Sequence, residues 1–184
     1  MIYAQKPKDG NPILRYLRQP IYDRKQVAAL ATQTLYFFKD FTSVNPLITN
    51  MNTPGSLGSP NEFYLYGISQ HVAASSKADI TKYLESSYVT VRISNNDIFK
   101  SPAFFIPDSG PISGVVSTTA SDTTLQSWYP GGNEKVLPVA LDQNSPIKIG
   151  SMELFELSVN MTAAAAPDAA FYVWFFLHGI YGTN

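Results

Sequence analysis

Short segments in which apolar and polar residues alternate recur along this chain. The clearest is 87–94, where the apolar residues Val89, Val91 and Ile93 alternate with Tyr88, Thr90, Arg92 and Ser94. The segment 152–162 repeats the same two-residue period. Successive side chains of a β-strand point to opposite faces, so this period predicts strands with one buried face. No long segment shows the period of an amphipathic helix.

Several further segments are rich in β-branched and aromatic residues, which favour strands. The segment 98–106 is also apolar, but Pro102 lies inside it, so any strand there is expected at a sheet edge or broken. The other strand candidates are 34–38, 62–72, 112–117, 136–141, 147–149 and 170–180. The chain therefore predicts about eight strands.

Two segments indicate local helix. The segment 77–86 carries apolar residues at helical spacing behind the candidate cap Asp79, and we expect a short helix or a loop there. Asp23 is a candidate cap for a short helical turn that runs to Ala31.

Turn-forming residues mark an arm and two long loops. Three prolines within 1–22 predict an irregular N-terminal arm, because proline breaks a helix. The segment 45–60 is dense in Asn, Thr, Pro, Gly and Ser and is interpreted as a long ordered loop. The segment 107–134 has a similar composition and is the longest loop region.

These elements predict an all-β fold with one domain over 1–184. Short strands separated by turn signals are typical of a β-sandwich or barrel. Eight strands in two sheets match a single eight-stranded jelly-roll sandwich, whereas an immunoglobulin-like domain is shorter. We expect the sandwich over 23–184 and the extended arm over 1–22.

Composition excludes some classes of site but does not by itself indicate one function. Charged residues make up 15% and aromatic residues 13% of the chain. Both values fit surfaces that are buried against neighbouring subunits, and they fit a large core equally well. The chain has no cysteine, which excludes disulfides and thiolate metal sites. No signal-peptide pattern opens the chain, and its most apolar stretch, 171–180, is too short for a membrane-spanning helix.

Charge is distributed unevenly. Residues 1–30 hold six basic and two acidic residues, a net charge of +4, whereas the remainder carries −5. An arm of opposite charge to the body can orient a protein against a polyanion. The basic residues Arg15, Arg18, Arg24 and Lys25 are therefore candidate inner-face or inter-subunit contacts, although a solvated N-terminus explains the same pattern.

No constellation of residues supports catalysis, a metal or a cofactor. His71 and His178 lie in separate strands without a cluster of further ligands, so both are expected to be structural. Glu153 and Glu156 are three residues apart in a strand, which places them on opposite faces and argues against a glycosidase pair. We therefore expect a protein that is not an enzyme.

Aromatic residues offer an alternative of another class. Tyr64 and Tyr66, together with Trp128 and Tyr129, could form a platform for sugar rings. Core or subunit contacts explain such residues as well. The alternative function is thus a carbohydrate-binding or receptor-binding, lectin-like jelly roll, with Trp128 and Tyr129 as the candidate glycan contacts.

Three stretches and the C-terminal strand carry a resemblance to a known family. They resemble the opening and the end of major capsid proteins from tailless icosahedral bacteriophages, including lipid-containing ones, over about a third of the chain. The segments are Arg18-Gln19-Pro20-Ile21-Tyr22-Asp23, Thr49-Asn50-Met51 with Pro54-Gly55-Ser56-Leu57, Pro60–Ile68 and Phe171–Ile180.

The resemblance implies a jelly-roll structural coat protein of a virion. Such proteins self-associate into trimeric or hexamer-like capsomers that tile a closed shell, often over an internal membrane. Many of them are double jelly rolls, whereas 184 residues hold only one. The expected partners are further copies of the chain and a second coat or vertex protein, with the basic arm facing an internal membrane or the genome. The expected location is the capsid, after synthesis in the host cytoplasm.

Overall fold

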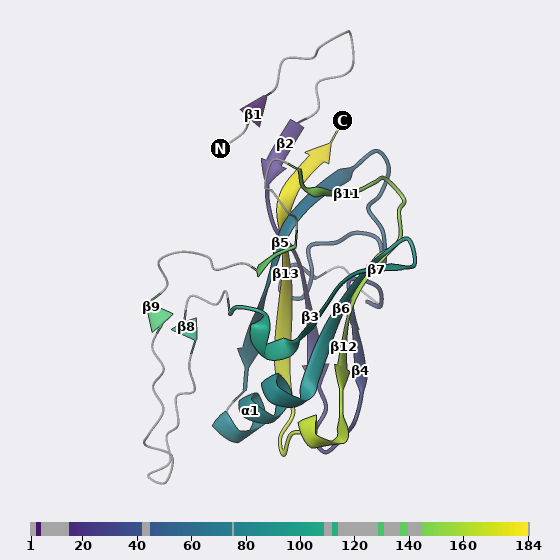
Figure 1. Cartoon of the computed structure of the whole chain (residues 1–184). Helices are drawn as coiled ribbons and strands as arrows, with labels where there is room; N and C mark the ends of the chain where they lie inside the picture. Colours follow the sequence, from purple (N-terminus) through teal and green to yellow (C-terminus); the bar gives the residue numbers. More distant parts are fainter. Residues whose placement is uncertain are drawn as a thin grey trace.

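Most of the described chain lies in two antiparallel β-sheets (Figure 1). The structure is a computed structural model that describes residues 3–4, 15–41, 45–74, 76–108, 112–113, 129–130, 137–139 and 145–183. Its elements in chain order are β1 Tyr3–Ala4, β2 Arg15–Arg18, β3 Ile21–Val27, β4 Thr34–Phe37, β5 Glu62–Ala73, α1 Lys77–Ser86, β6 Ser87–Ile93, β7 Asn96–Pro102, η1 Ala103–Phe105, β8 Ile112–Ser113, β9 Tyr129–Pro130, β10 Leu137–Pro138, β11 Ile147–Ile149, β12 Phe155–Met161, η2 Ala163–Ala165 and β13 Phe171–Thr183.

The first sheet is built around its two longest strands, β5 and β13. These strands pair along nearly their whole length, with an irregularity in register between His178 and Gly179. On its other side β13 pairs first with β3 and then with β2. Short strands β10 and β11 extend the sheet beyond β5, and β1 extends it beyond β2.

The second sheet has the order β4-β12-β6-β7. Its strands come from both halves of the chain, because β12 lies between β4 and β6. In Figure 1 this sheet lies beside the β5–β13 layer, with α1 at one end of the molecule and the C-terminal part of β13 at the other.

The two sheets bury their apolar faces against each other. Every second residue of β12 is buried, from Phe155 to Met161. Across the interior, the ring of Phe37 on β4 meets the ring of Phe175 on β13 edge-on, with centroids 4.8 Å apart. This burial confirms the expected two-layer, all-β architecture and explains the alternation in the sequence.

Helix α1 closes one end of the interior. Tyr83 is completely buried, packs edge-on against Phe171 and donates a hydrogen bond of 3.1 Å to the Gln70 side chain. Gln70 in turn donates to the backbone carbonyls of Ala103 and Ile106, each at 2.9 Å. One buried amide thus joins the first sheet, the helix and the turn that follows β7.

Replacing Gln70 by leucine is expected to destabilise the fold by about 2–4 kcal/mol. Leucine fills a similar volume but removes the acceptor of the Tyr83 hydroxyl and the side-chain donor of the buried Ile106 carbonyl, whereas the Ala103 carbonyl still accepts from the Ile106 N–H. Urea unfolding followed by fluorescence measures the loss. Tyr83→Phe removes a single hydrogen bond and should cost only about 1 kcal/mol. Equal stability of Gln70→Leu and the unchanged protein would contradict this account of the buried amide.

Most sequence-predicted elements are confirmed. The expected strands at 62–72, 87–94, 152–162 and 170–180 correspond to β5, β6, β12 and β13. The 77–86 segment is the helix α1, but Asp79 is not its cap, because it lies within the first turn and accepts hydrogen bonds from the N–H groups of Asp168 and Ala169. Strand β7 lies at the edge of the second sheet and ends at Pro102, as its proline predicts.

One prediction about the N-terminal region is wrong, and the structure revises part of another. The expected helical turn from Asp23 to Ala31 is instead the strand β3, which pairs with β13 over seven positions. The arm is also less irregular than expected, because Arg15–Arg18 forms β2 and pairs with β13. In both cases hydrogen bonds to a strand near the other end of the chain override the local signal, which sequence spacing does not reveal.

Candidate interaction surface

The outer face of the first sheet carries a connected group of aromatic and polar side chains. The residues of β13 that face the interior are buried, so alternation directs Tyr172, Trp174 and Phe176 outward. The cross-strand partners of Trp174 are Arg24 on β3 and His71 on β5. We call Arg24, His71, Tyr172 and Trp174 the aromatic platform.

Contacts within the platform hold its side chains in place. The Arg24 guanidinium lies 4.5 Å from the ring centroid of Tyr172 and 5.4 Å from that of Trp174. The ring centroid of Trp174 lies 6.1 Å from that of Tyr172 and 5.6 Å from that of His71. Contact with a guanidinium and with neighbouring, tilted rings restricts the rotamers of all four residues.

Polar groups border the platform. His71 contacts the Asp108 carboxylate through Nδ1 at 3.2 Å. Further along β13, the buried His178 shares a hydrogen bond of 2.7 Å with the Ser69 hydroxyl. The platform itself is only half-buried, and Tyr172 is 39% exposed. Large, rigid and partly exposed aromatic area next to arginine is the composition of binding hot spots.

The outer face of the second sheet is different in character. Glu156 on β12 forms ion pairs with Lys39 at 2.7 Å and with Arg92 at 3.4 Å. Arg92 also pairs with Asp97 at 2.7 Å. These charges compensate one another on the surface, where such pairs add little to stability. This face is typical of a solvated surface.

The four basic residues predicted as contacts do not form one cluster. Arg18 and Arg24 pair with outward-facing residues of β13, so both lie on the outer face of the first sheet. Arg18 is exposed. Arg15 is described only as part of the β2 backbone. Lys25 alternates with Arg24 and faces the opposite way.

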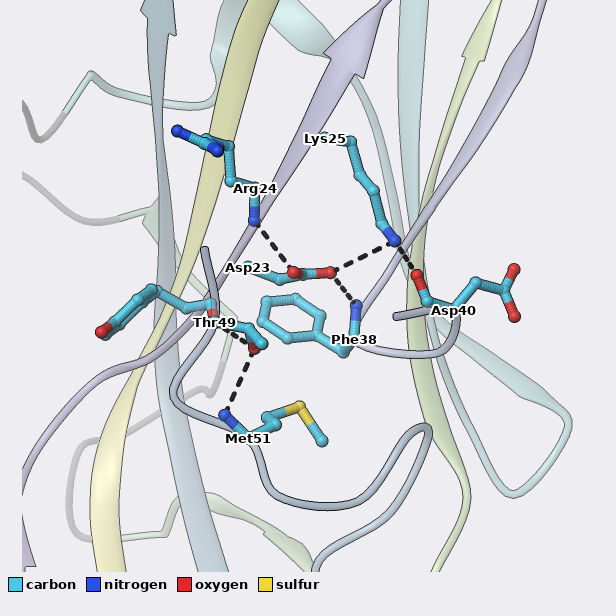
Figure 2. A network of polar contacts seen from close by, with 8 residues as sticks. Asp23, Arg24, Lys25, Phe38, Asp40, Thr49 and Met51 are labelled. Carbon is cyan, nitrogen blue, oxygen red and sulfur yellow. Dashed lines mark hydrogen bonds and ion pairs between the residues drawn. The ribbon is translucent and has the colours of Figure 1, made fainter. Parts of the chain in front are cut away.

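Lys25 belongs to a buried polar junction around Asp23 (Figure 2). The completely buried Asp23 carboxylate accepts hydrogen bonds from the backbone N–H groups of Phe38 at 2.7 Å and Arg24 at 3.0 Å. Its other neighbour is the Lys25 amino group at 3.8 Å, which also donates to the Asp40 carbonyl. Lys25 is therefore engaged within its own chain.

Burial raises the pKa of Asp23 above its ordinary value of 3.8, although the Phe38 N–H and Lys25 oppose the rise. The carboxylate joins β3 of the first sheet to the residue that follows β4 of the second. Phe38 has a left-handed backbone with φ of 68°, which is costly for a bulky residue. We infer a structural role for this junction.

The side chains of the two residues predicted to contact a glycan, Trp128 and Tyr129, are not described by the structure. Trp128 lies outside the described residues, and Tyr129 is described only as part of the β9 backbone. Tyr64 is on the outer face of the first sheet, where its hydroxyl donates to Glu62 at 2.7 Å. The amino group of Lys148 lies 5.9 Å from the Tyr64 ring.

The sequence interpretation missed the platform. It treated 170–180 as a uniformly apolar strand and took His71 as a structural histidine. A signal was present, since the residues of this segment that bear polar atoms are Tyr172, Trp174 and His178, all at even positions. The two-residue period places them on one face. No pattern in the sequence indicated that Arg24 on β3 and His71 on β5 would lie beside Trp174.

Among the described residues, no three His, Asp or Glu side chains are grouped as a metal site would require. Within the same part of the chain, no helix has the length and apolar character needed to cross a bilayer. No protein-family model, no curated protein and no solved structure matches this chain.

Proposed function

We propose that this protein is a structural coat protein that self-associates into capsomers of an icosahedral virus shell. The observation that carries the proposal is the aromatic platform on the outer face of the first sheet. A second coat or vertex protein is a natural additional partner of such capsomers. The resemblance of segments between residues 18 and 68 and of the last strand to bacteriophage capsid proteins supports the assignment to a virion.

The strand order supports a jelly-roll fold for this role. Successive long strands alternate between the sheets, because β3 and β5 belong to the first sheet whereas β4 and β6 belong to the second. The orders β3-β13-β5-β11 and β4-β12-β6-β7 are those expected of eight strands wound as two Greek keys. Fold alone does not decide function, so the proposal depends on the surface.

The platform suits a protein–protein contact for physical reasons. Tyr and Trp supply large contact areas with few rotatable bonds, and their mutual packing lowers the entropy lost on binding. Arg24 keeps its guanidinium stacked, with donors at its edge for a partner's carbonyls or carboxylates. The outer face of the second sheet also exposes Tyr36 and Tyr88 beside lysines, but its Arg92 is ion-paired with Asp97 and Glu156.

The first test is the oligomeric state of the purified chain, measured by light scattering across concentration and salt and by electron microscopy. Trimers, hexamers or shell-sized particles are expected. A chain that remains monomeric at high concentration in every salt would overturn self-association and bring the carbohydrate-binding alternative forward.

A matched pair of tyrosines tests the surface itself. Tyr172 is 39% exposed beneath Arg24, and Tyr88 on the second sheet is 36% exposed with the Lys100 amino group 4.7 Å from its ring. Tyr172→Ala should raise the concentration needed for assembly by about tenfold or more, as expected for a hot-spot residue. Tyr88→Ala should change it by less than about twofold.

Both variants lose a similar cation–π contact, so their unfolding curves should shift by similar amounts. A difference in assembly therefore reports on the surface and not on the fold. Equal assembly of the two variants would exclude the platform as the contact between subunits.

A further inference from the structure

A cavity of about 250 Å³ lies where the start of β3, the 49–61 part of the long loop and the end of β13 meet. It lies at the opposite end of the sheets from α1. Among the described residues that line it, none is Asp, Glu, Lys, Arg or His. Its lining is Gln19, Pro20, Ile21, Asn50, Met51, Asn52, Thr53, Ser56, Leu57, Gly58, Asn61 and Tyr181.

The loop that forms one wall is fixed by hydrogen bonds to both sheets. The Asn50 side chain accepts from the Tyr22 N–H at 2.9 Å and donates to the Pro20 carbonyl at 2.8 Å. Gly55 donates to the Phe38 carbonyl at 2.7 Å and accepts from the Phe155 N–H at 2.8 Å. A long loop held this firmly presents its side chains in a defined arrangement, and such loops frequently carry function.

The floor and the rim of the cavity differ. Ile21, Met51 and Leu57 are each only 4% exposed and provide an apolar floor. On the rim, the side chains of Gln19 and Asn52 are exposed, and neither makes a hydrogen bond to any residue in the described part of the chain. Amides both donate and accept, so the rim offers unused groups of both kinds.

We propose that this cavity binds one ring of an uncharged carbohydrate. The described lining carries no charge, which disfavours phosphate, carboxylate or cationic ligands, because these need a counter-charge when desolvated. Amides and hydroxyls above an apolar floor match a sugar, whose ring has hydroxyls at its edge and C–H groups on its faces. The volume lies just below the range of pockets for drug-sized ligands, which fits a single ring. This site is independent of the proposed coat function.

Saturation-transfer NMR on the full chain tests the site with methyl glycosides of glucose, galactose and N-acetylglucosamine. At least one should bind with a dissociation constant in the range of about 1–10 mM, as expected for so small a contact. Cyclohexanol, which has the same ring size and one hydroxyl, should show no transfer, and inorganic phosphate should not compete.

Substitutions on the rim test whether the sugar binds in this cavity. Asn52→Ala and Gln19→Ala should each weaken binding by about threefold to tenfold, because each loses hydrogen bonds to the ligand. Both side chains are exposed and have no hydrogen-bond partner among the described residues, so the unfolding curve should not change. Asn96→Ala, at an exposed asparagine outside the cavity, is the matched control and should bind as the unchanged protein does.

Three results would overturn the proposal: no transfer from any of the three glycosides at about 20 mM, equal transfer from cyclohexanol, or binding that survives the Gln19→Ala, Asn52→Ala double variant. Assembly is measured separately by light scattering, so failure of the sugar site and failure of the coat function are distinguishable.

Discussion

Replacing Gly179 by alanine should strongly destabilise this fold. Gly179 lies in the centre of the first sheet, at the irregularity between β13 and β5. A Cβ atom there would be 2.3 Å from the Phe63 ring and 2.5 Å from the Tyr64 carbonyl oxygen. Phe63 is completely buried and cannot swing away, and the carbonyl belongs to the paired strand.

The cost is expected to be at least about 3 kcal/mol, because the two longest strands must separate locally. Urea unfolding measures it. Gly58→Ala is the control, since a Cβ there would meet only the Thr53 hydroxyl at an ordinary 3.8 Å. That control should shift stability by less than about 1 kcal/mol. A Gly179→Ala protein as stable as the control would contradict the close approach of β13 to β5.

Replacing Asp23 by alanine is also expected to destabilise the fold strongly, with a loss of about 2–4 kcal/mol. The change leaves the buried Phe38 N–H without an acceptor and removes the restraint on a strained backbone. It also removes the carboxylate beside Lys25 (Figure 2). Asp23→Asn keeps one acceptor oxygen and should lose less. Equal stability of the two variants would contradict a role for the Phe38 hydrogen bond.

The pH dependence of stability separates Asp23 from the other carboxylates. Burial raises its pKa in the folded state above 3.8, so the folded protein holds this proton more tightly than the unfolded chain. Its contribution to stability is therefore greatest below pH 3.8 and is lost as the pH rises through the raised pKa. Relative to Asp23→Asn, the unchanged protein should become less stable across that window.

Glu153 provides a control of opposite sign. Hydrogen bonds from the Ser94 hydroxyl and the Gly150 N–H hold its pKa below the ordinary value of 4.5. Its stabilising contribution is present above pH 4.5 and is lost as the pH falls through the lowered pKa. Chemical denaturation at several pH values should give opposite slopes for Asp23→Asn and Glu153→Gln when each is compared with the unchanged protein. Parallel slopes would refute the assignment for Asp23.

The sequence by itself determined the kind of elements and their buried faces. Two-residue alternation predicted β6 and β12 with the inward residues that the structure buries. The proline at 102 predicted an edge strand, and turn residues predicted the long loop at 45–60. Each of these features depends on neighbours within a few positions, and spacing along the chain records such neighbours directly.

Only the tertiary structure decided which strands pair and what each outward side chain meets. Arg24 and Trp174 are 150 positions apart in the chain, yet they are cross-strand partners in the first sheet. The sequence predicted Asp23 as a helix cap, whereas in the structure its carboxylate accepts a hydrogen bond from the N–H of Phe38. The need for glycine at 179 also arises from Phe63 and Tyr64 on a distant strand. Spacing cannot encode such contacts, because they depend on sheet order and register, which the whole chain settles through non-local burial.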